Sequence, residues 1–286
     1  MAVPMSSSPG TSAAARGSHG PRSVTEPLPP EGLYIHFPFC VSLCPYCDFV
    51  VVAGSAARGP ANRIETLLDA VHRELELRAA SMPSHRAPLQ SVYLGGGTPS
   101  LMSSAQVEAL LVAVDRRIGV AADAEITLEA NPGSDEIGDL AGFAVAGVTR
   151  LSIGAQSLDD VELKRLGRRH RSVDVAAAVR SAREAGLGSV SLDLLTDIPG
   201  QTYESWRSTL RTALALEPDH LSAYTLSLDD PEEEGLTGPE GDHLPVSRGA
   251  RVWRDRARVE QSDERAAEME LLTDELAQAA GLERYE

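Results

Sequence analysis

Cys40-Val-Ser-Leu-Cys44-Pro-Tyr-Cys47 decides how the rest of the sequence is interpreted, because these eight residues contain all three cysteines of a 286-residue chain. A disulfide would leave one of the three thiols unpaired. A tetrahedral zinc site has four ligands, so it would need His36 or Asp48 as well. A cube of four irons normally takes four cysteines, and three cysteines would leave one iron open to an outside ligand. The spacing therefore indicates a metal site, and an open iron would indicate chemistry.

The composition favours one large folded unit without a nucleic-acid or membrane role. The chain is 42% hydrophobic and 24% charged, which is enough for one large core. A net charge of -16 argues against a broad nucleic-acid-binding face, which needs clustered Lys and Arg. The sequence shows no apolar run near the roughly 20 residues of a membrane span. We therefore expect a cytoplasmic protein, where thiolates stay reduced, with no nucleic-acid partner and no stable membrane insertion.

The chain divides into a tail, a core and a C-terminal region. Residues 1–30 are rich in Ser, Ala, Gly and Pro and lack periodic apolar residues, so a disordered tail is predicted. Residues 31–228 form the predicted core. Residues 229–286 begin with an acidic loop and end with one further helix.

Strand and helix patterns alternate along the core. Strands are predicted at 33–36, 91–94, 126–130, 150–155, 189–195 and 221–226, and helices at 61–79, 103–117, 135–146, 159–167, 173–185, 202–216 and 262–280. Ser103 and Gln106 have capping-box spacing, and Ser157 is expected to open the helix at 159–167. Six strands that alternate with helices predict a parallel α/β sheet in an open (β/α)6 form, a three-quarter barrel.

Polar motifs follow the predicted strands at their carboxyl ends, where ligands bind in parallel α/β folds. Gly95-Gly96-Gly97 would let bare backbone approach a ligand, although a tight turn is the alternative. Glu129, Gln156 and Asp193 would point into an otherwise apolar barrel mouth, either toward a ligand or as satisfied polar core residues. The basic run comprises Lys164, Arg165, Arg168, Arg169, His170 and Arg171. It suits a helix C-terminus, and one arginine from it could turn inward to bind a carboxylate.

The spacing Cys-x3-Cys-x-aromatic-Cys, with Tyr46 as the aromatic residue, resembles the signature of the radical S-adenosylmethionine (SAM) enzymes. The segments Tyr34-Ile-His-Phe-Pro-Phe-Cys40, Gly95-Gly-Gly-Thr-Pro-Ser100, Glu129-Ala-Asn-Pro132, Ser152-Ile-Gly-Ala-Gln156-Ser, Leu166-Gly-Arg-Arg169-His and Pro199-Gly-Gln-Thr202 are similar to those of the oxygen-independent coproporphyrinogen oxidase group, which includes haem chaperones. The similarity extends over residues 33–286, and it also implies the six-repeat barrel.

This resemblance implies a set of cofactors and site residues. A [4Fe-4S] cluster would be held by Cys40, Cys44 and Cys47, and its open iron would chelate the amino and carboxylate groups of SAM. SAM contacts are implied at Tyr34, Gly96, Gly97, Thr98, Glu129, Gln156, Arg169 and Asp193. The implied partners are haem as cargo, an unknown haem-acceptor protein and an electron donor for the cluster.

Three functions are compatible with these features. Asp48 and Phe49 follow Cys47 where the oxidases of the group carry Gly and a fourth Cys, so a haem chaperone is favoured over a coproporphyrinogen dehydrogenase. The third possibility is a non-catalytic electron-transfer or zinc-binding module.

Two departures from the family pattern qualify these expectations. Thr196-Asp197 replaces an aromatic residue and a glycine, which would place a carboxylate near the substrate mouth. The family also normally continues well beyond Glu286, so the C-terminal region is expected to be incomplete. Any haem ligand within the chain would then be His36, His170 or a cysteine.

Overall fold

The computed structural model describes residues 31–47, 49–53, 62–83, 87–226 and 261–285, together with residues 252 and 255. The predicted tail at 1–30 and the acidic stretch that begins at residue 229 lie outside these residues, so the predicted domain boundaries stay predictions. None of the helices in the described part of the chain has the length and apolar character needed to cross a bilayer.

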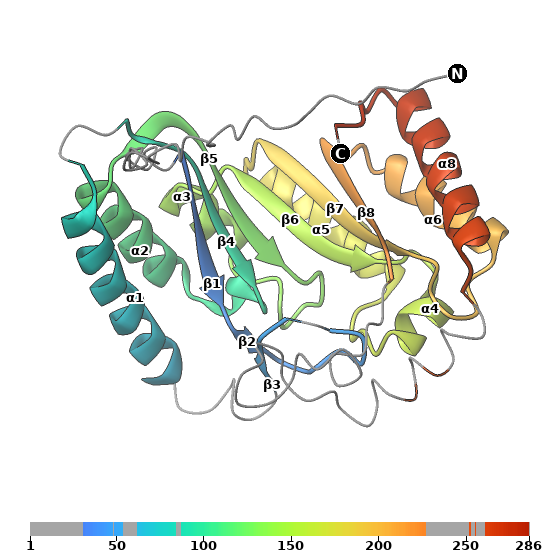
Figure 1. The fold of residues 1–286 in the computed structure, drawn as a ribbon, viewed down its shortest axis with the longest axis horizontal. Helices are drawn as coiled ribbons and strands as arrows, with labels where there is room; N and C mark the ends of the chain where they lie inside the picture. Colours follow the sequence, from blue (N-terminus) through green and yellow to red (C-terminus); the bar gives the residue numbers. More distant parts are fainter. Residues whose placement is uncertain are drawn as a thin grey trace, which may run out of the picture.

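A six-stranded parallel sheet forms the centre of the molecule (Figure 1). Its strands, in spatial order, are β1 (Gly32–Phe37), β4 (Leu89–Gly96), β5 (Val120–Ala130), β6 (Arg150–Gln156), β7 (Ser189–Thr196) and β8 (His220–Thr225). Each strand pairs in parallel with the next one in this order, and β1 and β8 are the two edges. The open (β/α)6 sheet predicted from the alternation of strands and helices is confirmed.

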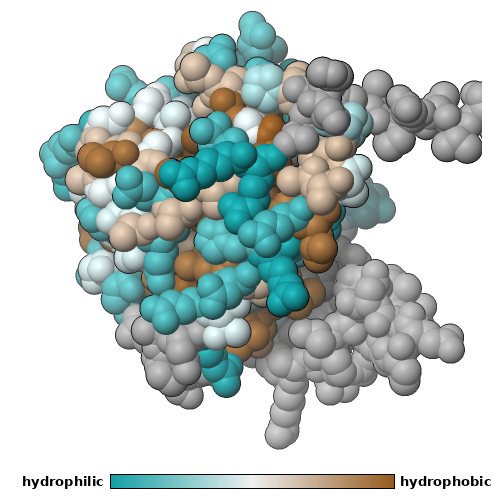
Figure 2. Space-filling model, turned by 90° about the vertical axis from the view of Figure 1, so that its left-hand side faces the viewer, coloured by the Kyte–Doolittle hydropathy of each residue, from teal (hydrophilic) through white to brown (hydrophobic). Residues whose placement is uncertain are grey.

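Helices cover the outer face of this sheet (Figure 1). They are α1 (Asn62–Ser81), α2 (Ser104–Arg117), α3 (Leu140–Ala146), α4 (Asp160–Arg165), α5 (Ser172–Glu184), α6 (Tyr203–Leu214) and α8 (Asp263–Ala279), with a short 3-10 turn η2 at Pro99–Leu101. The predicted capping box of α2 is present, since Ser103 accepts from the Gln106 N–H and Gln106 accepts from the Ser103 N–H. Figure 2 shows the side of the molecule at α1, where hydrophilic residues make up most of the described surface.

The two faces of the sheet differ in polarity because alternate side chains of a strand point to opposite faces. Val92, Leu94, Leu151 and Leu192 are fully buried in the core between the strands and the helices. The intervening positions carry polar side chains, among them Tyr93, Glu129, Ser152 and Asp193. The inner face is therefore polar along several strands, and the expectation of an apolar barrel mouth with three isolated polar groups is wrong.

Two predicted helix starts are wrong. The helix predicted at 135–146 begins at Leu140, because residues 133–136 form a separate turn and Gly138 has φ +75°. Asp139 caps it by accepting from the Gly142 N–H. Ser157 does not open the next helix either, since Asp159 accepts from the N–H groups at the start of α4. Ser157 instead donates to the buried carboxylate of Glu162 over 2.6 Å.

Helix α8 is fixed to the end of β7 through Asp197, the residue predicted to place a carboxylate near the substrate mouth. The Asp197 side chain is 3% exposed and pairs with the Arg265 guanidinium at 2.9 Å. Asp197 has φ +55°, a conformation that glycine adopts without strain, which explains why glycine suits this position in the family. The carboxylate is therefore engaged by α8 and serves packing.

We predict that Arg265→Ala lowers the free energy of unfolding by about 2–4 kcal/mol, because it leaves a buried carboxylate without its counter-ion. Adding Asp197→Gly should recover part of the loss, since glycine removes the charge and accepts the positive φ. Urea unfolding measures both. Arg284→Ala is the control, because its pairs with Glu270 and Asp274 are exposed and should contribute little to the free energy of unfolding. A double variant no more stable than Arg265→Ala would contradict this account.

Candidate functional site

The cysteine loop leaves the carboxyl end of β1 and is closed by a pair of two-residue strands, β2 (Phe39–Cys40) and β3 (Val52–Ala53). The loop after β4 holds it from one side. The Gly97 N–H donates to the Phe37 carbonyl over 2.7 Å, and the Thr98 N–H donates to the Phe39 carbonyl over 2.8 Å. These backbone bonds fix the start of the cysteine loop against the second β/α unit.

The glycine run is required by close contact as well as by backbone conformation. Gly96 has φ +117°, so a side chain there would be strained. A Cβ at Gly97 would lie 2.6 Å from the Phe39 carbonyl oxygen and 3.0 Å from the Cys40 sulfur. Bare backbone therefore approaches the cysteine loop at Gly97. Its approach to a ligand stays a prediction.

The three cysteines form no disulfide and are partly exposed. Two of them receive hydrogen bonds from other β/α units: the Thr98 hydroxyl donates to Cys40 and the Arg168 guanidinium donates to Cys44, each over 3.7 Å. Burial raises the pKa of the Cys40 thiol to about 11, although the bond from Thr98 opposes this rise. Metal binding at Cys40 would therefore release a proton at neutral pH.

The donor set suits an iron-sulfur cube, and the zinc alternative that would use Asp48 involves a residue outside the described part of the chain. Zinc binds thiolates at about 2.3 Å and so draws its ligands together around a single ion. In the described part of the chain, no three His, Cys, Asp or Glu side chains are gathered in this way. A cube places each thiolate on a different iron, and two of the three thiols, Cys40 and Cys44, accept hydrogen bonds from neighbouring donors, as cluster ligands do.

Arg168 is the functional residue that the sequence analysis left unassigned. It follows Gly167, which has φ +68° and ends α4 in a Schellman turn, with the Arg168 N–H bonded to the Leu163 carbonyl and the Gly167 N–H to the Lys164 carbonyl. The reversal directs Arg168 back over the strand ends, where its side chain donates to the Gly154 carbonyl over 2.7 Å and to Asn131. The Leu166-Gly167 pair was the sequence signal for this turn.

The surroundings of Arg168 keep it charged. Burial acts to lower its pKa, but the neighbouring Tyr46 hydroxyl and Cys44 thiol raise it overall. Tyr46, the aromatic residue of the cysteine motif, packs against a small apolar cluster formed by Leu166, Leu195, Ile198 and Leu226. Burial also raises the pKa of Tyr46, against the effect of Arg168. A fixed positive charge therefore lies directly beside Cys44.

Arg169, the arginine predicted to contact SAM, has different side-chain partners from Arg168. Its side chain is 43% exposed and pairs with Asp135 at 2.5 Å and with Glu136 at 3.8 Å. The described contacts thus place Arg168 at the cysteine loop and Arg169 beside the turn after β5.

Glu129, Tyr93 and Tyr34 form a connected group on the inner face. The Glu129 carboxylate accepts from the Tyr93 hydroxyl over 2.8 Å and from the Gly96 N–H over 2.9 Å. Burial raises its pKa, while these two bonds oppose the rise. Tyr34 stacks on Tyr93 with ring centroids 5.9 Å apart, and its side chain is 54% exposed. A carboxylate and an exposed ring thus face the space beside the glycine loop.

Gln156 and Asp193 lie next to each other across β6 and β7. Gln156 has φ +67° at a bulge where the register shifts after Gly154, and its amide nitrogen lies 3.1 Å from where a Cβ of Gly154 would be. Asp193 pairs in register with Gly154 and accepts from the Ser152 hydroxyl at 3.0 Å and 3.2 Å. Burial raises the pKa of Asp193 to about 6. The predicted cysteines and polar residues therefore converge on one end of the sheet, and their roles toward SAM stay predictions.

The two histidines considered as haem ligands are both engaged within the protein. His170 is 4% exposed, its Nε2 lies 3.1 Å from the Ala155 carbonyl oxygen, and burial lowers its pKa to about 4. The His36 ring bridges the Tyr34 hydroxyl at 3.0 Å and the Val50 carbonyl at 2.9 Å. His170 is closed off, whereas His36 lies at the base of the cysteine loop.

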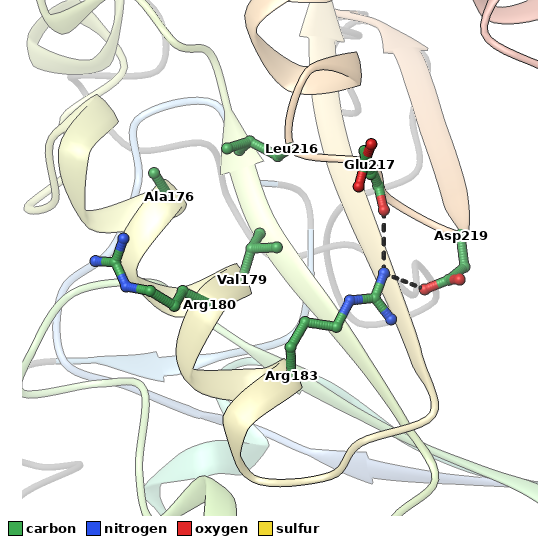
Figure 3. A pocket seen from close by; sticks show the side chains of 7 residues that line it. All are labelled: Ala176, Val179, Arg180, Arg183, Leu216, Glu217 and Asp219. Atoms are coloured by element: carbon green, nitrogen blue, oxygen red, sulfur yellow. Dashed lines mark hydrogen bonds and ion pairs between the residues drawn. The ribbon is translucent and has the colours of Figure 1, made fainter.

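A separate shallow hollow lies near the amino ends of the strands (Figure 3). It is lined by Ala176, Val179, Arg180, Arg183, Leu216, Glu217 and Asp219. Arg183 crosses it to pair with Asp219 at 2.7 Å and to bond the Glu217 carbonyl at 3.0 Å. Its position away from the cysteines separates it from the predicted site.

Comparison with known proteins identifies the family. The model of the Radical SAM superfamily matches residues 34–213. The chain belongs to the radical SAM superfamily. Membership implies a [4Fe-4S] cluster and SAM, and the three cysteines and their neighbours fit that pair of groups. As a radical SAM protein, the chain is expected to keep the cluster's open iron at the carboxyl end of the sheet, where the polar residues converge.

Three similar proteins carry names that bear on function. The chain is 41% identical over 202 residues to "Heme chaperone HemW" of Haemophilus influenzae, covering 71% of this chain and 52% of that one. It is 40% identical over 202 residues to HemW of Escherichia coli, with the same coverage. The solved structure of coproporphyrinogen III oxidase (HemN) from Escherichia coli aligns with TM-score 0.73 at 26% identity, covering 89% of this chain and 54% of that one. The chain spans about half the length of the curated relatives that it matches.

We predict that Asp193→Asn changes how stability depends on pH. The folded-state pKa of Asp193 is raised from 3.8 to about 6, so its favourable contribution is present below pH 4 and is lost as pH rises through 6. The asparagine amide carries no charge and avoids this loss. The free energy of unfolding of the variant should match that of the wild type near pH 4 and exceed it by about 3 kcal/mol at pH 7.5, since one pKa unit is about 1.4 kcal/mol. Urea titrations at both pH values measure this, and an equal difference at the two values would contradict the shift.

Proposed function

We propose that this radical SAM protein is a haem chaperone of the HemW type, which carries a [4Fe-4S] cluster and SAM and transfers haem to an acceptor protein. The observation that carries the proposal is the convergence of the Cys40–Cys47 loop, the Gly96–Thr98 loop and Arg168 at one end of the sheet. It occurs in a chain 41% identical over 202 residues to a HemW protein.

Cys40, Cys44 and Cys47 would hold three irons and leave the fourth for SAM. When bound, the cluster supplies the electron that cleaves the SAM sulfonium. The protein's part is to bind and orient SAM and to keep water away from the reacting groups. Glu129, on the inner face beside the glycine loop, would accept from the SAM ammonium, and Asp193 and Gln156 would bond the ribose hydroxyls.

Arg168 takes the role that the family resemblance assigned to Arg169. Its guanidinium already lies beside Cys44 and keeps its charge, so it can pair with the SAM carboxylate or with cluster sulfur. The side chain of Arg169 pairs with Asp135 and Glu136 instead. The two arginines are adjacent in the sequence, and the contact of Arg168 with Cys44 after the turn at Gly167 supports the choice of Arg168.

The chaperone is favoured over a coproporphyrinogen dehydrogenase by the residues that follow the cysteines. Asp48 and Phe49 stand where the oxidases of the group carry Gly and Cys, and Phe49 is 65% exposed. The likeness to HemN supports the alternative, but the identity of 26% is lower than the 41% to HemW. For the haem ligand, burial of His170 and the use of all three cysteines by the cluster leave His36 among the residues first considered.

Anaerobic reconstitution tests the proposed function. The wild-type chain should take up about four irons, and Cys44→Ser should lose the visible absorption of the cluster. The loaded protein should then shift the Soret band of added haem and form no vinyl products from coproporphyrinogen. Decarboxylation would establish the dehydrogenase instead. Stoichiometric zinc without iron uptake would indicate the non-catalytic module.

We predict that Arg168→Ala weakens SAM binding by about 10-fold or more, because it removes a charged hydrogen-bond donor worth roughly 1.5–3 kcal/mol. Arg169→Ala, with the same change of charge, should leave the dissociation constant within about 2-fold. Equilibrium binding to the reconstituted protein measures both, and iron content confirms equal loading. A larger effect of Arg169→Ala on the SAM dissociation constant would instead support the SAM contact that the resemblance implies at Arg169.

A further inference from the structure

The side chain of Asn131 connects three elements around the cysteine loop. Asn131 follows β5, and its amide nitrogen donates to the Thr98 hydroxyl over 3.1 Å and to the Glu136 carboxylate over 3.3 Å. Its amide oxygen accepts from the Arg168 guanidinium. A Cβ at Gly154 would lie 3.2 Å from that oxygen, so the glycine leaves the space in which Asn131 and Arg168 meet.

Thr98 and Arg168, two hydrogen-bond partners of Asn131, each also bond to a cysteine. Thr98 donates to the Cys40 sulfur and Arg168 donates to the Cys44 sulfur. Asn131 is therefore linked to two of the three thiols through one intervening side chain each, although it contacts neither thiol. No role was assigned to it from the sequence or from the resemblance.

The direction of these bonds follows from the chemistry of the groups. A threonine hydroxyl has one proton and two lone pairs. Because the Asn131 amide donates to the Thr98 oxygen, the Thr98 proton is free to point at Cys40. On the other side, the Asn131 and Gly154 oxygens take the protons of one Arg168 nitrogen, which leaves the other nitrogen facing Cys44.

Only an amide meets both requirements at this position. A carboxylate could accept from Arg168 but could not donate to Thr98, and it would face the buried carboxylate of Glu136. An aliphatic side chain would do neither and would leave the Thr98 hydroxyl free to rotate.

We propose that Asn131 is a positioning residue that aims the Thr98 hydroxyl and the Arg168 guanidinium at the cluster sulfurs and thereby raises the cluster's reduction potential. The proposal rests on the proposed function in that it requires the cluster. Donors to sulfur stabilise the reduced cluster more than the oxidised one, because reduction adds negative charge to the sulfurs. A correctly aimed pair of donors makes the cluster easier to reduce.

The test is a redox titration of the reconstituted chain, followed by the EPR signal of the reduced cluster. Asn131→Ala should shift the midpoint potential to a more negative value. Thr98→Val, which removes the donor to Cys40 but keeps the side-chain shape, should shift it in the same direction. The double variant should shift it by less than the sum, because both changes act through the same hydroxyl. Gln90→Ala, an exposed amide at the amino end of β4, should leave the potential unchanged.

Asn131→Asp provides a second variant of equal size in case the alanine variant folds poorly. The added charge of Asn131→Asp would by itself also lower the reduction potential, and a shift caused by charge would add to the shift of Thr98→Val. A shift caused by loss of the bond to Thr98 would not add in full, because Thr98→Val already removes the hydroxyl. Two results would overturn the role of Asn131 and leave the proposed function standing. One is additive shifts of the potential, and the other is a wild-type potential in variants that retain about four irons. A wild-type chain that takes up no cluster would overturn the proposed function and this inference together.

Discussion

The backbone bonds from Gly97 and Thr98 to the carbonyls of Phe37 and Phe39 are the constraint on which the site depends. They join the loop after β4 to the loop after β1, so the loop that carries all three thiols is held by the neighbouring β/α unit. The close approach is possible only because Gly97 has no side chain, since a Cβ there would overlap the Phe39 carbonyl. The cysteine loop is thereby held at the β1 edge of the sheet.

The polarity of the sheet explains why such a site can exist in this fold. The outer face of the strands packs against helices α1, α2, α3, α5, α6 and α8 to form the core, and the inner face presents Tyr93, Glu129, Ser152 and Asp193. A closed eight-stranded barrel fills its interior with apolar side chains. Six strands leave the sheet open, so its inner face can stay polar and bind a charged ligand. The raised pKa values of Glu129 and Asp193 show the cost of placing carboxylates there, which a bound cation would offset.

The sequence predicted the fold well because its signals are local and repeated. Alternating strand and helix patterns gave six parallel strands, and the Ser103–Gln106 box located the start of α2. The signals failed where a single backbone feature outweighs the pattern. Gly138 interrupts the predicted helix before α3. The SAM contact implied at Arg169 stays a prediction, and the turn at Gly167 is followed by Arg168, which donates to Cys44.

Contacts between distant segments were beyond the reach of the sequence for a different reason. Asp197 was expected at the substrate mouth, but its partner Arg265 lies 68 positions along the chain on α8. The bonds of Asn131 likewise join the ends of three β/α units. Such pairings follow from the packed structure, since nothing in the spacing of these residues indicates them. The identities of the site residues were therefore easier to predict than their partners.

The central claim is that three cysteines hold a four-iron cluster whose remaining iron is open to SAM. Mössbauer spectroscopy of the iron-57 cluster, recorded with and without SAM, tests it most directly. The account predicts that SAM changes the signal of about one iron in four and leaves the rest as they were, because only one iron lacks a thiolate. A spectrum that SAM does not change, or one in which all irons shift alike, would contradict it.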